Sequence, residues 1–148
     1  MIRFLSFLLF LLCCHSPMGM AQGKKDMKDY WIDKYLSVSF PLESIRINST
    51  FGSRVDPFTG KHKQHKGLDL RARYEEVLSM FDGYVKGVGY DSGSGKYITM
   101  QYGDYTVSYC HLSEIWVSDN QKVYAGDPIG ISGTTGRSTG PHLHITCR

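Results

Sequence analysis

Two histidines near the end of the chain have the spacing of a strand that carries chemistry on one face. His142 and His144 lie in the run TGPHLHIT. Side chains two positions apart on a strand point to the same face, about 7 Å apart, so both imidazoles are predicted to enter one site. Leu143 and Ile145 would then face the other way, toward apolar packing. The alternative is a pair of histidines on a solvated face.

A second group of metal-ligand residue types lies in HKGLD, from His65 to Asp69. Gly67 and the lack of a helical apolar period predict a loop that enters a strand at residues 68–70. Imidazole nitrogens and carboxylate oxygens are ordinary zinc ligands, and two histidines with one carboxylate and an open fourth position form a catalytic zinc set. By itself the cluster is equally compatible with a surface histidine and a turn aspartate.

A further histidine, His111, lies in the run SYCHLS and could join the same site from another strand. A histidine close to a bound metal is suited to proton transfer. Strict alternation along a strand puts Tyr109 on the face of His111 and Cys110 on the opposite face. The hydroxyls of Tyr109 and Tyr102 are then candidates to stabilise an oxyanion.

Short antiparallel strands are the elements expected to position these residues. Turn signals rich in Gly, Asp and Pro recur from Asp56 onward. The runs between them alternate strand formers, as in residues 84–90, 96–102 and 105–112. The glycine and aspartate at 103–104 predict a β-hairpin between the last two runs. The expected fold class is mostly β, a small antiparallel β-sheet domain.

The first residues have the features of a signal peptide. Arg3 is followed by an apolar run, Phe4–Cys14, and by Gly-Met-Ala at residues 19–21, the spacing that a signal peptidase reads. The apolar run is shorter than the roughly 18 residues of a membrane span. We expect a signal peptide over residues 1–21 and export to the periplasm or the extracellular side of the cell envelope. The alternative is a lipoprotein anchored through Cys13 or Cys14.

The rest of the chain divides into a lead-in and one domain. Residues 22–39 are charged and then aromatic, and the aromatic spacing fits either a short N-terminal helix or an extended lead-in. Residues 40–148 have the length of a single domain. We expect this domain to be a monomer.

The charge of the chain limits the classes of partner that we expect, and its cysteine content raises the question of a disulfide. Loss of Arg3 with the leader changes the formal net charge from +3 to +2, which is too weak and too dispersed to indicate nucleic acid. No transmembrane helix is expected in the mature chain. Two cysteines, Cys110 and Cys147, remain in an exported chain, and they form either a disulfide or two buried thiols.

Three motifs in sequence order resemble one known family. The strings FGSRVDPFTGKHKQHKGLD, YCHLS and GDPIGISGTTGRSTGPHLH are similar to the M23 zinc metallopeptidases of the lysostaphin or LytM type. The resemblance implies one zinc ion per chain on His65, Asp69 and His144, with His111 and His142 as flanking catalytic histidines. It also implies a narrow substrate groove and, as substrate, peptide cross-links of bacterial peptidoglycan.

The same resemblance defines two competing functions. The first is an exported zinc endopeptidase, and the second is a non-catalytic module that binds peptidoglycan or activates another hydrolase. Family members often continue beyond the H-x-H strand, so the peptidase domain over residues 40–148 is expected to lack a C-terminal strand. The loop before the H-x-H strand contains Gly133, Gly136 and Gly140. We expect these glycines to adopt positive φ or to allow close backbone approach.

Overall fold

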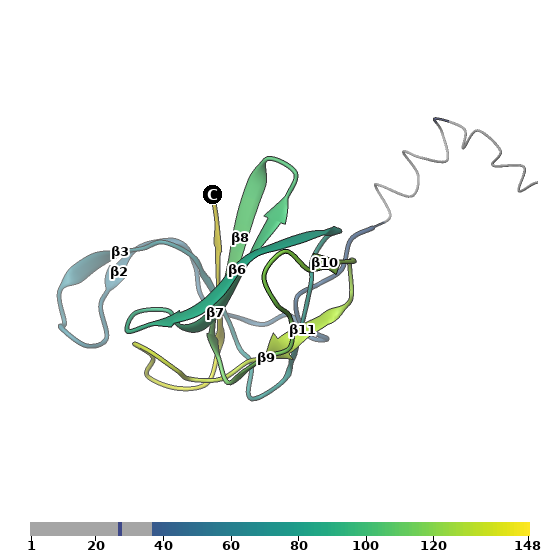
Figure 1. Cartoon of the computed structure of the whole chain (residues 1–148). Helices are drawn as coiled ribbons and strands as arrows, with labels where there is room; N and C mark the ends of the chain where they lie inside the picture. Colours follow the sequence, from purple (N-terminus) through teal and green to yellow (C-terminus); the bar gives the residue numbers. More distant parts are fainter. Residues whose placement is uncertain (1–26, 28–36) are drawn as a thin grey trace, which may run out of the picture. The chain divides into compact units, whose positions relative to one another are not determined.

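The computed structural model describes Met27 and residues 37–148 of the chain (Figure 1). The predicted signal peptide lies outside the described residues, and so does most of the 22–39 segment for which a helix or lead-in is expected. Within the described part, no helix is long and apolar enough to cross a membrane.

The described domain is built from β-strands, as the alternating sequence pattern predicts. Most strands are short, because turn residues interrupt the strand formers every few positions. In chain order the strands are β1 (Ile47–Ser49), β2 (Gly52–Val55), β3 (His62–His65), β4 (Leu68–Leu70), β5 (Glu76–Leu78), β6 (Gly83–Asp91), β7 (Gly95–Tyr102), β8 (Tyr105–Leu112), β9 (Glu114–Ile115), β10 (Lys122–Val123), β11 (Pro128–Ile131) and β12 (Leu143–Cys147).

Seven of these strands form the main sheet, in the order β1-β4-β12-β8-β7-β6-β10. Each neighbouring pair is antiparallel. The predicted hairpin is present, with Tyr102 opposite Tyr105 at the end of β7 and β8. The last strand, β12, inserts between β4 and β8, so the H-x-H motif lies beside the strand that HKGLD enters.

One face of the main sheet packs on the hydrophobic core. Alternation places Leu143 of β12 in this core with no exposed surface, and Ile145 packs against it. The opposite face is therefore available for polar side chains. The buried apolar residues are Leu42, Leu70, Ala72, Val77, Val85, Ile98, Met100, Tyr102, Val107, Tyr109, Leu112, Val117, Val123, Ile129 and Leu143.

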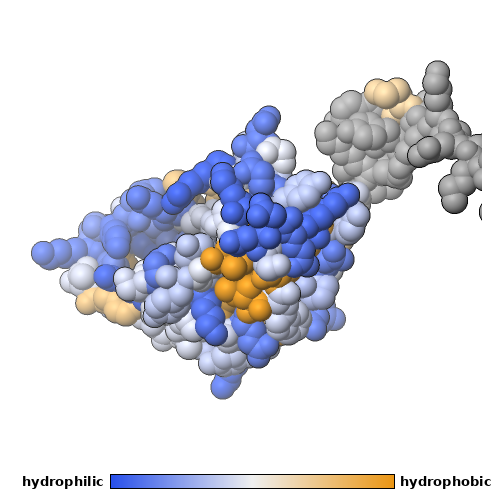
Figure 2. All heavy atoms as spheres, in the orientation of Figure 1, coloured by the Kyte–Doolittle hydropathy of each residue, from blue (hydrophilic) through white to orange (hydrophobic). Residues whose placement is uncertain are grey.

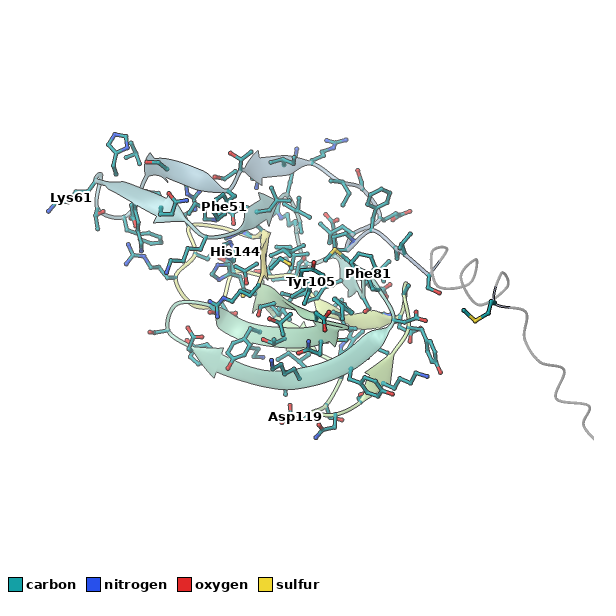
Figure 3. The ribbon with its side chains drawn as sticks, turned by 90° about the horizontal axis from the view of Figure 1, so that it is seen from above. Phe51, Lys61, Phe81, Tyr105, Asp119 and His144 are labelled. Carbon is teal, nitrogen blue, oxygen red and sulfur yellow. The ribbon has the colours of Figure 1, made fainter. Side chains whose placement is uncertain are left out.

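Two smaller sheets complete the domain. Strands β5, β11 and β9 form a three-stranded sheet, and β2 pairs with β3 as a separate hairpin. This hairpin extends to the left of the main sheet in Figure 1, and Figure 3 places Lys61 at its far end. The surface in Figure 2 is mostly hydrophilic, with a strongly hydrophobic patch near the middle of the face toward the viewer.

Candidate metal centre

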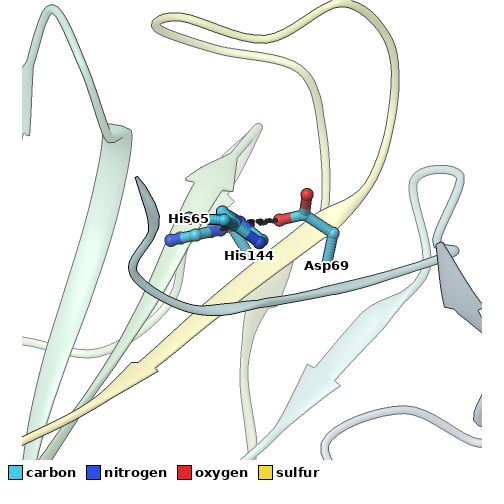
Figure 4. A group of neighbouring side chains, drawn as sticks. All are labelled: His65, Asp69 and His144. Atoms are coloured by element: carbon cyan, nitrogen blue, oxygen red, sulfur yellow. Dashed lines mark hydrogen bonds and ion pairs between the residues drawn. The ribbon is translucent and has the colours of Figure 1, made fainter. Parts of the chain in front are cut away.

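Side chains from three strands meet at one point. His144 of β12 stands directly opposite Asp69 of β4, and His65 ends β3. Asp69 Oδ1 lies 2.6 Å from His144 Nδ1 and 3.1 Å from His65 Nε2, and the two histidine nitrogens are 3.1 Å apart. Figure 4 shows the Asp69 carboxylate directed at the His144 ring, and Figure 3 places His144 near the middle of the domain. The three residues are the metal-ligand set expected from the sequence, and the fold brings them together.

Backbone and arginine contacts decide which atoms face this point. His65 Nδ1 donates to the Thr50 carbonyl at 2.8 Å. A carbonyl oxygen only accepts, so the lone pair of the neutral His65 ring lies on Nε2. Arg54 Nη2 contacts Asp69 Oδ2 at 3.2 Å, which leaves Oδ1 for the histidines. Such outer contacts orient metal ligands and contribute to metal affinity.

The donor set fits a zinc ion. Zinc bonds of about 2.0–2.2 Å in a tetrahedron separate the ligand atoms by about 3.4 Å. The observed separations of 2.6 and 3.1 Å need to open only by fractions of an ångström. The backbone of Gly67 packs against the His144 ring, because a Cβ at position 67 would lie 2.7 Å from His144 Cε1 and Nε2. The ring of His144 thus lies directly on the backbone of Gly67.

The electrostatics of Asp69 favour the carboxylate form. Its exposed fraction is 5%, and burial alone would raise the pKa of the carboxyl group. The hydrogen bond from His144 and the charges of His142 and His65 outweigh burial, so the pKa lies below its ordinary value. A metal ligand must be deprotonated, and Asp69 meets that requirement at neutral pH.

The two remaining histidines lie beside the three ligand candidates. The ring centroid of His111 is 4.7 Å from that of His142 and 5.7 Å from that of His144. His142 Nε2 lies 3.6 Å from Asp69 Oδ1. The predicted sharing of one strand face by His142 and His144 is present, because both line the same groove. All five histidine and aspartate residues expected at the site are therefore in one place.

Backbone carbonyls hold both flanking histidines in the same tautomer. His111 Nδ1 donates to the Thr135 carbonyl at 2.8 Å, and His142 Nδ1 donates to the Gly140 carbonyl at 2.8 Å. Each neutral ring then carries its lone pair on Nε2. Burial lowers the pKa of His111 despite its hydrogen bond to Thr135, so the neutral ring predominates at neutral pH.

A β-bulge alters the predicted faces of β8. Lys96 pairs with Leu112 and Ile98 pairs with Tyr109, so Cys110 and His111 together stand opposite a single β7 residue. His111 has a φ of 63°, in the left-handed region. The extra residue breaks the alternation, and Cys110 lines the groove beside His111. The expectation that Cys110 points away from the site was wrong for this reason.

The same bulge directs Tyr109 into the core. Its exposed fraction is 0%, and its hydroxyl contacts the Met80 N–H at 3.1 Å and the Tyr102 hydroxyl at 2.9 Å. Burial raises the pKa of Tyr102 and raises that of Tyr109 well above its ordinary value. These hydroxyls stabilise the interior, and the interpretation that they assist an oxyanion is not borne out.

The two cysteines of the domain are both free. Cys147 stands opposite Val107, and Cys110 stands opposite His144. Cys110 faces the groove, whereas Cys147 is an odd number of positions from His144 and faces the other side. The disulfide considered from the sequence does not form, and only Cys110 is buried, so the alternative of two buried thiols is half correct.

A groove of about 850 Å³ runs over this face of the sheet. Its floor beyond the histidines includes Thr99, Ser108 and Thr146, which are paired across β7, β8 and β12. The rest of its lining includes basic residues such as Lys63 and Lys66 and acidic residues such as Asp56 and Asp91. A polar lining with charges of both signs suits a polar ligand such as a peptide.

Glycines of the loop before β12 behave differently from one another. Gly136 has a φ of 71°, as expected. Gly133 allows close approach, since a Cβ there would lie 2.7 Å from the Ser113 nitrogen. Gly140 has neither a positive φ nor a crowded Cβ position, so the expectation fails there.

Contacts that orient the site were missed from the sequence. Arg54 and Thr135 are the clearest cases, the first through Asp69 and the second through His111. Arg54 is far in sequence from His65, Asp69 and His144. The Thr135 contact is made by a backbone carbonyl, which every residue has, so the residue type does not reveal it. Only the pairing of β2 with β3 and the path of the loop reveal them.

A His/Asp/His ligand set with two flanking histidines, on a groove in a small antiparallel sheet, suits metal-assisted hydrolysis of an amide. The chain belongs to peptidase family M23: the family model matches residues 63–148, which is more than half of the chain. The family expected from the three motifs is thereby confirmed.

Known relatives agree with this assignment. The peptidoglycan DD-endopeptidase ShyA of Vibrio cholerae is 40% identical over 109 residues, covering 71% of this chain and 25% of ShyA. A zinc-containing peptidase from Vibrio cholerae has a crystal structure with a TM-score of 0.66 at 34% identity, over 73% of this chain and 35% of that chain. The lysostaphin catalytic domain from Staphylococcus simulans gives 0.64 at 30% identity, over 70% and 79%. The chain spans less than a third of the length of the curated relatives it matches.

Proposed function

We propose that this chain is an exported zinc metalloendopeptidase that hydrolyses peptide cross-links of bacterial peptidoglycan. The observation that carries the proposal is the convergence of His65 Nε2, Asp69 Oδ1 and His144 Nδ1 within 4.8 Å of one another. Two further histidines with their Nδ1 atoms fixed by carbonyls adjoin this point. A purely structural metal site does not require two oriented histidines beside the ion.

His65, Asp69 and His144 would hold the ion. One zinc ion bound there would supply a Lewis acid for the scissile carbonyl and a water whose pKa is lowered to about 7. The single carboxylate leaves the ligand set with fewer negative charges than the ion has positive ones. The site therefore favours the negative charge that develops on the carbonyl oxygen.

His111 and His142 would move the protons. His111 is the candidate general base, because burial keeps its ring neutral and its lone pair lies on Nε2. His142, whose Nε2 lies near Asp69, would donate a hydrogen bond to the oxyanion or a proton to the leaving amine. With its Nδ1–H donated to the Gly140 carbonyl, His142 can donate from Nε2 only as a doubly protonated ring, so this tautomer is the one that can take up a proton at Nε2 and then deliver it.

The substrate and the location are inferred from relatives and from the leader. ShyA is named as a peptidoglycan DD-endopeptidase, and the groove here has the polar lining described above. The signal peptide expected over residues 1–21 would deliver the domain at 40–148 to the cell envelope. We therefore infer peptidoglycan as the substrate and the cell envelope as the location.

Digestion of purified sacculi tests the proposal. Soluble peptide fragments with new amino termini should be released by the zinc-loaded chain, should disappear with a chelator and should return with added zinc. Asp69→Asn should remove both zinc binding and release, and Arg73→Ala, an exposed substitution outside the groove, should change neither. Binding to sacculi without release by the zinc-loaded chain would instead indicate the non-catalytic module.

A further inference from the structure

One loop supplies the backbone carbonyls that orient both flanking histidines. The clamp loop, residues 133–141, connects β11 to β12. It presents the Thr135 carbonyl to His111 and the Gly140 carbonyl to His142. The path of this loop therefore decides which nitrogen of each ring carries a proton.

Different outside contacts anchor the two halves of the clamp loop, which meet each other at the hydrogen bond from Thr134 Oγ1 to Ser138 Oγ, 3.0 Å long. Thr135 Oγ1 donates to the Leu112 carbonyl at 2.7 Å and accepts from the Lys96 N–H at 2.9 Å. These bonds fix the half that contacts His111. The half that contacts His142 lies after Gly136 and has no part in them.

Arg137 anchors the second half on two sides. Its N–H donates to the Gly93 carbonyl at 3.0 Å. Its Nη2 donates to both carboxylate oxygens of Asp56, each at 3.0 Å. Its guanidinium carbon lies 4.5 Å from the centre of the Phe58 ring. One residue thus joins the clamp loop to the β6–β7 turn and to the β2–β3 hairpin.

Backbone N–H groups of the turn after Asp56 hold its carboxylate in place for the contact with Arg137. Its residue is 6% exposed, and Oδ1 accepts from the N–H groups of Phe58 at 2.8 Å and Thr59 at 3.1 Å. The Phe58 bond contributes most to holding the pKa of Asp56 below its ordinary value. A carboxylate fixed by its own turn offers Arg137 a rigid partner.

The Ser138 hydroxyl is a second possible hydrogen-bond partner for His142 Nδ1. Its hydroxyl donates to the Gly140 carbonyl at 2.7 Å and lies 3.3 Å from His142 Nδ1. If the loop moved, this hydroxyl could donate to Nδ1 instead, and the proton of the neutral ring would then lie on Nε2. The loop position selects between these two states.

We infer that Arg137 is a positioning residue that clamps the second half of the loop and thereby fixes His142 in the tautomer with Nδ1 protonated. Its effect on turnover rests on the proposed function, whereas its effect on the tautomer does not. His111 is predicted to be insensitive to Arg137, because Thr135 has its own anchors.

The test compares Arg137→Ala and Asp56→Asn with the control Arg73→Ala, all as the full zinc-loaded chain. Nitrogen-15 NMR of the imidazoles at about pH 8 reports the tautomer of each ring. In both clamp variants the Nδ1 and Nε2 signals of His142 should move toward a mixture of tautomers, and those of His111 should stay.

Kinetics provide the second measurement. A misplacement of about 1 Å can cost up to about a hundredfold in rate, so kcat on a soluble cross-linked peptide should fall about ten- to hundredfold in Arg137→Ala with zinc affinity unchanged. Unchanged His142 signals in Arg137→Ala would overturn the inference. So would equal changes in both histidines, which would indicate general loosening. If the parent chain shows no hydrolysis, the proposed function fails and the NMR result still decides the role of Arg137.

Discussion

The substitution Gly67→Ala tests whether close packing below His144 is needed for metal binding. A Cβ at this position would lie 2.4 Å from the Ile145 carbonyl oxygen and 2.7 Å from two atoms of the His144 ring. Gly67 has no positive φ, so alanine adds steric overlap without backbone strain of its own. The overlap is with backbone on one side and with a ligand candidate on the other.

The size of the effect follows from these distances. Widening the contact from 2.4 Å to at least 3.0 Å moves β12 away from β4 by about 0.6 Å. Metal–ligand distances tolerate only about 0.2 Å. Asp69 and His144 lie on the two strands that separate, so we expect zinc affinity to fall by about ten- to hundredfold, the scale of lost ligand support. Overpacking should also lower the free energy of unfolding by about 1–3 kcal/mol.

Competition with a chromophoric zinc chelator measures the affinity, and thermal unfolding measures the stability. Gly87→Ala is the matched control, because nothing lies within 4 Å of its Cβ position and its φ is not positive. Equal zinc affinity in the parent chain and in Gly67→Ala, with the control unchanged, would refute the reasoning. It would mean that the ion does not lie between β4 and β12.

The remaining predictions concern the histidines, the metal and the thiols. His111→Ala and His142→Ala should keep zinc affinity and lose about 10²–10⁴-fold in kcat, as measured by zinc titration and steady-state kinetics. Because burial lowers the pKa of His111, its ring in the zinc-free chain should stay neutral from about pH 8 down to about pH 6.5, and imidazole NMR that shows protonation of His111 above neutrality would contradict this. Zinc at about a hundred times its Kd should stabilise the fold by about 2.7 kcal/mol, and melting curves that coincide with and without zinc would count against the site. At about pH 8 iodoacetamide should modify exposed Cys147 and spare Cys110, whose pKa burial raises to about 11, as mass spectrometry would show.

Periodicity was sufficient to predict the strands that carry two of the ligand candidates. The alternation of His142, Leu143 and His144 predicts one functional and one apolar face, and Leu143 is in the core as expected. The end of HKGLD forms β4 as expected. In both cases the local pattern and the tertiary packing favour the same orientation, so the sequence is informative.

Long-range register was not accessible in the same way. Nothing in SYCHLS indicates that β8 gains one residue relative to β7, and this extra residue reverses the predicted faces of Tyr109 and Cys110. Bulges arise from the pairing of two strands, whereas alternation describes one strand at a time. For the same reason, the contacts from Arg54 to Asp69 and from Arg137 to Asp56 depend on segments that the sequence does not place together.

The bulge at His111 also explains how one sheet face accommodates two kinds of residue. A regular β8 would direct Tyr109 and His111 to the same side, so either the core would lose a large side chain or the site would lose a histidine. With the extra residue, Tyr109 stays at 0% exposure while His111 faces the groove. The left-handed φ of 63° costs of order 1–3 kcal/mol for a residue other than glycine. The His111 N–H bond to the Ser94 carbonyl at 2.7 Å and the Nδ1 bond to Thr135 offset part of that cost. Strain at His111, stabilised from two separate loops, is what the proton-transfer role proposed for this histidine would require.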